Sequence, residues 1–212
     1  MPRGDWRVYV ITEARPERGR SHRDVAEAAL RGGATAVQLR MKEEPARVLV
    51  EVARLLLPLC RLRGVPLLVN DRVDVAVATG ADGAHVGQDD LPAASARALL
   101  GPDRFLGVSA ATVEEALAAW RDGADYVGVG PVYATGTKPD AGEPVGLERI
   151  RAISAAVPIP VVGIGGITAD TAAAVIRAGA AGVAVITAVS LAEDMVEATR
   201  RLREAVDAAL SS

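Results

Sequence analysis

Eight short apolar runs, each followed by a segment with helical character, organise this chain along its length. The runs are rich in β-branched residues, and polar or glycine-rich clusters stand at the end of almost every one. Strands that alternate with helices in this way are typical of an α/β fold with a parallel sheet, and eight repeats predict a (β/α)8 TIM barrel. The expected strands are 7–12, 35–40, 66–70, 82–87, 105–109, 125–130, 158–166 and 181–187.

Capping residues, prolines and glycines mark the expected helices. Ser21, with Asp24 three residues later, forms a capping-box pattern before a helix at 22–32. Pro45 stands in the first turn of a long helix over 45–63, and the last helix is expected at 192–209. The loop at 131–146 is longer than most connections, which favours a binding or lid role for it.

Length and composition bound the class of protein. A chain of 212 residues suits one well-buried core, so we expect a single domain over 1–212. The net charge of −3 and the aromatic content of 3% argue against a nucleic-acid-binding surface. The one cysteine, Cys60, suits a reducing compartment, and no segment resembles a signal peptide or a membrane span. We therefore expect a cytoplasmic protein that acts on small molecules without nucleic-acid or membrane partners, and the sequence leaves its oligomeric state open.

A row of cations follows the second expected strand. Alternate residues of a strand point to the same side, so Gln38, Arg40 and Lys42 are expected to share one face at the barrel mouth. Arginine can grip phosphate oxygens with two parallel hydrogen bonds, and lysine adds a mobile charge, so the row is a candidate anion site. Alternatively, the two cations are solvated loop residues paired with Glu43 and Glu44.

Carboxylates follow the third and fourth expected strands. Asn70 and Asp71 end one strand, and Asp89 and Asp90 come shortly after the next. Carboxylates from adjacent strand ends meet at the same rim and suit Mg²⁺, which takes one or two carboxylates together with substrate phosphate and water. Alternatively, Asp71 caps the next helix, and Asp89 or Asp90 forms a turn before Pro92.

Glycines and a threonine follow the last two expected strands. Gly165 and Gly166 end the seventh strand, and Ile186 and Thr187 end the eighth. The loops after these strands form a recurring phosphate site in TIM barrels, where glycine lets backbone N–H groups approach the ligand. Alternatively, the glycines serve only a tight turn.

The long loop after the sixth strand carries Thr135, Thr137 and Lys138. Two hydroxyls and a cation on a loop suit closure over an oxyanion, although a solvated surface loop would have the same composition.

Ser109 ends the fifth expected strand and could be a nucleophile, a hydrogen-bond donor or a small wall residue. A serine nucleophile needs an adjacent base, and neither His22, in the first helix, nor His85, inside a strand, is expected to lie beside it. We therefore expect Ser109 to be a donor and His85 to be a buried histidine with a partner in the core.

Seven motifs occur in order at the expected strand ends: QLRMK, VNDR, HVGQDD, GVSA, YVGVGPVYATGTKP, VVGIGGI and VITAVS. Together they resemble the thiamine-phosphate synthase family over nearly the whole chain. The resemblance implies an enzyme that joins 4-amino-2-methyl-5-hydroxymethylpyrimidine diphosphate to thiazole phosphate, or to its carboxylate. The products would be thiamine phosphate and pyrophosphate.

The resemblance also implies roles for individual residues. The pyrimidine diphosphate would be held by Gln38, Arg40, Lys42, Asn70, Ser109 and Lys138, of which Arg40, Lys42, Ser109 and Lys138 would be catalytic. Mg²⁺ would be held by Asp71 and Asp90. The thiazole phosphate would be held by Thr135, Thr137, Gly165 and Thr187, with the neighbouring Gly166 and Ile186.

The charges agree with this assignment. Two aspartates cancel the charge of Mg²⁺, which leaves Arg40, Lys42 and Lys138 facing a diphosphate of about −3, since phosphates are largely ionised above a pKa of about 6. The implied route is dissociative: pyrophosphate leaves, the aminopyrimidine stabilises the cation, and the thiazole nitrogen attacks. Preset cations then stabilise the transition state more than the ground state.

Two other functions fit parts of the sequence. A related barrel isomerises the thiazole carboxylate phosphate and is expected to carry a histidine just after the fifth strand, where this chain has Ala110 and Ala111. A non-catalytic paralogue that binds thiazole or thiamine phosphate would be expected to lose the charged row, which is present here.

Overall fold

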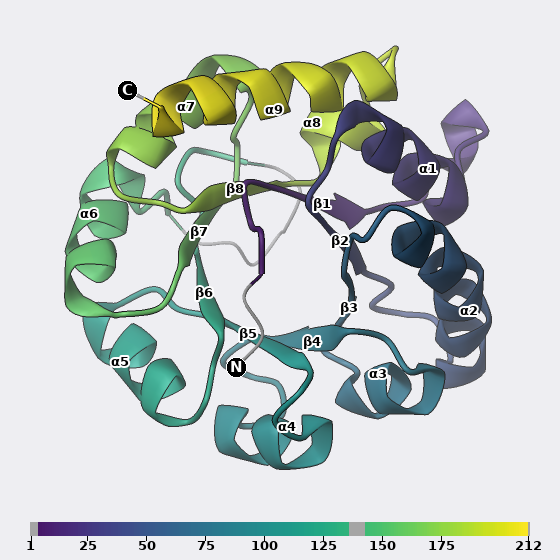
Figure 1. Cartoon of the computed structure of the whole chain (residues 1–212), viewed down its shortest axis with the longest axis horizontal. Coiled ribbons are helices and arrows are strands. Elements are labelled where there is room, and N and C mark those ends of the chain that lie inside the picture. The colour runs from purple at the N-terminus through teal and green to yellow at the C-terminus, as the bar shows by residue number, and fades with distance from the viewer. Residues whose placement is uncertain (1–3, 136–142, 212) are drawn as a thin grey trace.

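Eight parallel strands close into a barrel in the computed structural model, which describes residues 4–135 and 143–211 (Figure 1). Each strand pairs with the next along the chain, and the first pairs with the last. The predicted (β/α)8 TIM barrel is therefore confirmed. The strands are β1 (Val8–Thr12), β2 (Ala36–Leu39), β3 (Leu67–Asn70), β4 (Gly83–Val86), β5 (Phe105–Ser109), β6 (Tyr126–Val129), β7 (Val161–Ile164) and β8 (Gly182–Val185).

Helices surround the strands as an outer ring, and the last long helix lies across α1 and α7 (Figure 1). The helices are η1 (Pro16–Arg18), α1 (His22–Gly32), α2 (Ala46–Leu62), α3 (Val73–Thr79), α4 (Ala93–Leu100), α5 (Val113–Arg121), α6 (Gly146–Ala156), α7 (Ala169–Arg177), α8 (Thr187–Ser190) and α9 (Met195–Leu210). Among the described residues, no helix is both long and apolar enough to span a bilayer.

Local capping sets the helix boundaries. The Ser21 hydroxyl accepts a hydrogen bond from the backbone N–H of Asp24, whose carboxylate accepts one from the N–H of Ser21, so the predicted capping box is confirmed. The last helix was predicted to begin at residue 192 but begins at 195. The Asp194 carboxylate accepts bonds from two N–H groups of its first turn, and a separate short helix, α8, precedes it.

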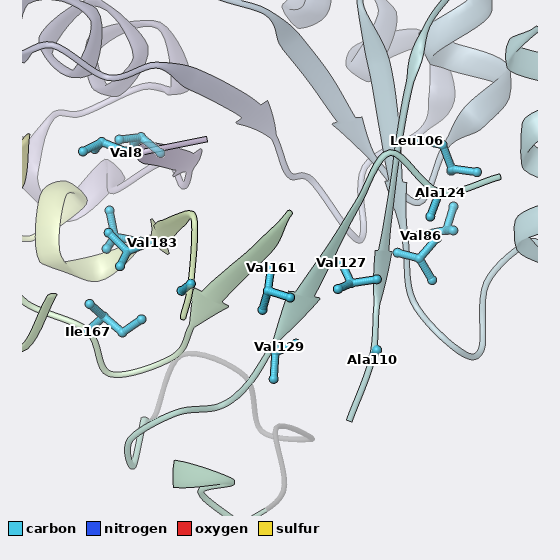
Figure 2. Packing of buried hydrophobic residues seen from close by; sticks show 14 of the residues in the cluster. Val8, Val86, Leu106, Ala110, Ala124, Val127, Val129, Val161, Ile167 and Val183 are labelled. Atoms are coloured by element: carbon cyan, nitrogen blue, oxygen red, sulfur yellow. The ribbon is translucent and has the colours of Figure 1, made fainter. Parts of the chain in front are cut away.

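Side chains alternate between two apolar layers. In β1, Val8 and Val10 belong to the layer between the strands and the helices, whereas Tyr9 and Ile11 belong to the cluster inside the barrel. Figure 2 shows part of the outer layer, which includes Val8, Val86, Leu106, Val127, Val129, Val161 and Val183. These residues come from six of the eight strands, and a separate cluster that includes Val37, Leu39 and Leu67 packs β2 and β3 against α1 and α2.

Aromatic rings fill part of the barrel interior. The Trp6 ring centroid lies 4.0 Å from that of Tyr126 and 5.2 Å from that of Phe105. Tyr9 packs edge-on against Tyr126 with a centroid distance of 5.9 Å. These rings therefore form a packed core inside the barrel below its mouth.

Candidate active site at the carboxyl ends of the strands

A cavity of about 500 Å³ opens where β5, β6, β7 and β8 end. Its walls are the segments that directly follow these strands, as is usual for ligand sites in this fold. Six residues that the sequence singled out line it: Ser109, Thr135, Gly165, Gly166, Ile186 and Thr187. All six lie at the strand ends where the sequence placed them, although their contact with a ligand stays a prediction.

The glycine loop after β7 packs tightly against the segment after β6. Gly165 and Gly166 have positive φ angles of 97° and 64°, and a Cβ on Gly166 would lie 2.7 Å from the carbonyl oxygen of Ala134. The backbone N–H of Tyr133 donates to the carbonyl oxygen of Gly165 at 3.1 Å. Only glycine combines this backbone conformation with so close an approach, so the cavity wall here is made largely of backbone.

The short helix α8 borders the same cavity with Thr187, its first residue. Two arginines of the loop after β1 hold its far end: Arg18 donates to the carbonyl oxygen of Leu191 at 2.9 Å, and Arg20 donates to that of Ser190 at 2.8 Å. Sequence reasoning missed both the helix and the arginines. A four-residue helix has no periodicity to read, and the contacts join residues more than 160 positions apart.

A second, smaller cavity of about 40 Å³ lies deeper, inside the barrel. It is lined by Gln38, Arg40, Asn70 and Ser109, four of the residues expected to hold the pyrimidine diphosphate. Ser109, Gly128, Ile164 and Ala184 line both cavities, so the two spaces share one wall. Within the described part of the chain, the buried Nε of Arg40 has no hydrogen-bond partner.

The cationic row is only partly as predicted. β2 ends at Leu39, so strand alternation does not reach Lys42, which is exposed in the loop before α2 and lines neither cavity. The expectation that Lys42 shares a strand face with Gln38 and Arg40 is therefore wrong. The alternative, in which Arg40 and Lys42 pair with Glu43 and Glu44, also fails, since neither cation forms an ion pair with a described residue. Thr137 and Lys138 lie outside the described residues.

Asp71 and Asp90 follow the neighbouring strands β3 and β4, in which Asn70 stands opposite His85. The N-cap of α3 is Arg72, so the alternative role of Asp71 as a helix cap is not supported. Asp71 has a φ of 59°, a conformation that aspartate tolerates better than most residues. Asp90 accepts a hydrogen bond from the N–H of Gly87 at 2.7 Å, so its carboxylate does stabilise a turn.

This donor set fits a hard cation that also binds substrate. The described residues contain no group of three or more histidine, cysteine, aspartate or glutamate side chains arranged to hold a metal ion. Two carboxylates from adjacent strand ends are nevertheless what Mg²⁺ needs when phosphate oxygens and water complete its coordination.

Ser109 has a histidine beside it, contrary to the sequence prediction. His85 Nε2 lies 2.9 Å from the Ser109 hydroxyl oxygen, and His85 Nδ1 lies 2.9 Å from the Tyr126 hydroxyl. The prediction that His85 has a partner in the core is confirmed, and the prediction that no histidine adjoins Ser109 is wrong. β4 and β5 are neighbours in the barrel, which brings residues 24 positions apart into contact.

The fold and the two connected cavities define a (β/α)8-barrel protein with a small-molecule site at the carboxyl ends of its strands. Residues 8–189 match the family described as thiamine monophosphate synthase, and the chain belongs to this family. Thiamine-phosphate synthases of Chloroflexus aurantiacus and Moorella thermoacetica are 58% and 57% identical to it, over 95% of this chain and 93% and 96% of theirs. A solved thiamine phosphate pyrophosphorylase from Pyrococcus furiosus superposes with a TM-score of 0.89, at 42% identity and over 98% of both chains.

Proposed function

We propose that this protein is a thiamine-phosphate synthase that joins 4-amino-2-methyl-5-hydroxymethylpyrimidine diphosphate to thiazole phosphate and releases pyrophosphate. Family membership makes the chain a transferase of thiamine biosynthesis. The observation that carries the finer proposal is that Ser109, Gly128 and Ile164 line both cavities, so the two cavities adjoin. Two substrates bound in adjoining cavities can be held with their reacting atoms close together.

The larger cavity suits the thiazole phosphate. Its walls of glycine backbone and the start of α8 present N–H groups, which bind phosphate oxygens well. Thr187 and Thr135 add hydroxyl groups to the same wall. The apolar side chains of Ile164 and Ile186 can cover the faces of a five-membered ring.

We assign the pyrimidine diphosphate to the residues around the deeper cavity. Gln38 and Asn70 would supply amide groups for the ring, and the guanidinium of Arg40 would supply a positive charge for the departing diphosphate. The buried Nε of Arg40 has no partner among the described residues, which supports this role because such a donor is costly unless a ligand completes its hydrogen bonds. In our proposal Lys42 and Lys138 add charge from loops.

Asp71 and Asp90 would hold Mg²⁺. When bound, the ion would neutralise part of the charge that develops on pyrophosphate as its C–O bond breaks. The chain's own residues would keep the substrate oriented and the leaving group paired, so the dissociative route requires no enzymic nucleophile.

The direct test is to incubate the purified protein with both phosphorylated precursors and Mg²⁺ and to measure thiamine phosphate by chromatography and pyrophosphate by a coupled assay. We expect equal amounts of the two products and loss of both with a chelator. Absence of pyrophosphate would refute the synthase, and turnover of the thiazole carboxylate alone would favour the isomerase.

The metal assignment has its own test. Asp71→Asn should raise the Mg²⁺ concentration needed for half-maximal rate by about tenfold or more, because the ion loses a carboxylate ligand. Asp74→Asn is the matched control, since Asp74 lies three residues away and pairs with Arg72 on the surface of α3. Equal Mg²⁺ requirements in the two variants would refute the assignment of Asp71.

A further inference from the structure

A continuous line of hydrogen bonds crosses the barrel interior between two residues of the proposed pyrimidine site. Gln38 Nε2 donates to the Tyr9 hydroxyl at 2.7 Å, and the Tyr9 and Tyr126 hydroxyl oxygens lie 3.0 Å apart. His85 Nδ1 lies 2.9 Å from the Tyr126 hydroxyl, and His85 Nε2 lies 2.9 Å from Ser109 Oγ. We call Tyr9, Tyr126 and His85 the relay; it links Gln38 to Ser109.

The strands leave space for the relay at one position. Gly107 stands opposite His85 in β4 and opposite Tyr126 in β6. A Cβ on Gly107 would lie 2.2 Å from the Tyr126 hydroxyl and 2.5 Å from His85 Nδ1. Any side chain at this position would therefore occupy the space of the hydrogen bond between Tyr126 and His85.

The direction of the relay follows from its tyrosine pair. The Tyr9 hydroxyl oxygen accepts hydrogen bonds from Gln38 Nε2 and from the Tyr126 hydroxyl. Because Tyr126 donates its proton to Tyr9, the Tyr126 oxygen accepts from His85 Nδ1–H. The neutral imidazole then carries no proton on Nε2, which accepts from the Ser109 hydroxyl.

This direction sets what the two ends offer a ligand. The Gln38 amide nitrogen is engaged with Tyr9, which leaves its carbonyl oxygen as an acceptor. Ser109 donates its proton to His85, which leaves its oxygen as an acceptor. The amino group of a 4-aminopyrimidine has two N–H donors, one for each of these acceptors.

The relay is unsuited to base catalysis. In a serine hydrolase a carboxylate behind the histidine stabilises the imidazolium that forms, whereas here the group behind His85 is a tyrosine hydroxyl. Burial raises the pKa of both Tyr9 and Tyr126, so both hydroxyls remain neutral near pH 7. Ser109 is therefore oriented by His85 rather than activated by it.

We propose that His85, Tyr126 and Tyr9 are positioning residues that hold the Ser109 oxygen and the Gln38 carbonyl as hydrogen-bond acceptors for the amino group of the aminopyrimidine. The inference rests on the proposed function for the identity of the ligand. The relay itself is a property of the folded chain and can be observed without substrate.

A double-mutant cycle on Tyr126 and Ser109 tests the kinetic consequence. Tyr126→Phe removes one hydroxyl and should lower kcat/KM for the pyrimidine diphosphate about tenfold, the effect of one lost hydrogen bond, while KM for thiazole phosphate changes less than about twofold. In a Ser109→Ala background the same change should have less than about a twofold effect, because the relay then has no serine to orient. Equal effects in both backgrounds would overturn the proposal.

Thr199→Val is the matched control. It also deletes a hydroxyl from a buried residue, one that donates to the carbonyl oxygen of Met195 within α9, away from both cavities. Its kinetic constants should equal those of the wild type. A loss of kcat/KM in this variant equal to that of Tyr126→Phe would attribute the Tyr126 effect to general destabilisation and overturn the proposal.

Nitrogen-15 NMR of the imidazole tests the relay independently of activity. The chain has two histidines, so a His22→Gln variant leaves only the His85 signal. We expect Nδ1 protonated and Nε2 unprotonated near pH 8, and a mixture of tautomers in Tyr126→Phe. Protonation at Nε2 instead would overturn the relay, whereas the expected tautomer in a protein without synthase activity would refute only the proposed function.

Discussion

Replacing Gly166 by alanine should damage the protein in two separable ways. The φ of Gly166 is +64°, a left-handed conformation that costs a residue with a Cβ about 1–2 kcal/mol. The new Cβ would also lie 2.7 Å from the carbonyl oxygen of Ala134 and 2.8 Å from Cβ of Tyr133. Contacts this short force the loops after β6 and β7 apart, at a cost of about 1–3 kcal/mol by analogy with overpacked cores.

Gly64 supplies the control because it shares the backbone conformation without the crowding. Its φ is also +64°, and nothing lies within 4 Å of the Cβ position. Gly64→Ala should therefore cost about 1–2 kcal/mol, and Gly166→Ala about 2–5 kcal/mol. The difference between the two variants isolates the steric contact between the loops.

Urea unfolding followed by circular dichroism measures these free energies, with the slope m fitted for each variant. A slope of about 2 kcal/mol per M would move the midpoint of Gly166→Ala roughly 0.5–1.5 M below that of Gly64→Ala. Gly166→Ala should also raise KM for thiazole phosphate, whereas Gly64→Ala should not. Equal losses of stability in the two variants would refute the steric argument.

Three further predictions concern residues outside the cavities. Arg20→Ala removes a hydrogen-bond donor from the carbonyl oxygen of Ser190 at the end of α8. KM for thiazole phosphate should therefore rise several-fold, while KM for the pyrimidine diphosphate stays constant. Equal changes in the two KM values would contradict this prediction. Burial raises the pKa of the Cys60 thiol to about 12, so iodoacetamide at pH 8 should label it only after unfolding in urea, and rapid labelling of the native protein would be incompatible with its burial. Burial lowers the pKa of His22, so the unfolded chain binds the proton more tightly. Stability should then be complete above the unfolded pKa of about 6.5 and fall as the pH drops below it, and thermal melts of His22→Asn should show a shallower fall than wild type.

Local sequence patterns were sufficient to predict the barrel and many of the residues at the carboxyl ends of its strands. Short apolar runs rich in β-branched residues predict strands, and a serine with an acid three residues on predicts the start of α1, because both signals depend only on neighbouring residues. Once eight strands are expected, the fold itself brings their ends together. That is why Ser109, Thr135 and Gly166 could all be placed at the carboxyl ends of strands before any geometry was known.

Predictions failed where a boundary or a lateral contact decided the outcome. Lys42 was placed on a strand face, but β2 ends at Leu39, and alternation has no meaning beyond a strand's end. α8 was not predicted because its four residues make about one helical turn, which is too short to show a hydrophobic periodicity. Arg18 and Arg20 were given no role in the sequence analysis, although their partners lie on the segment after β8.

The order of apolar and polar residues along this chain was enough to determine a parallel barrel, its helix caps and the polar groups at its mouth, since each of these depends on spacing within one segment. Tertiary structure alone decided which groups meet inside. β4, β5 and β6 lie side by side in the closed sheet. His85, Ser109 and Tyr126, up to 41 positions apart, therefore form hydrogen bonds across the interior. Such contacts depend on strand register around a closed ring, which no local pattern of residues encodes.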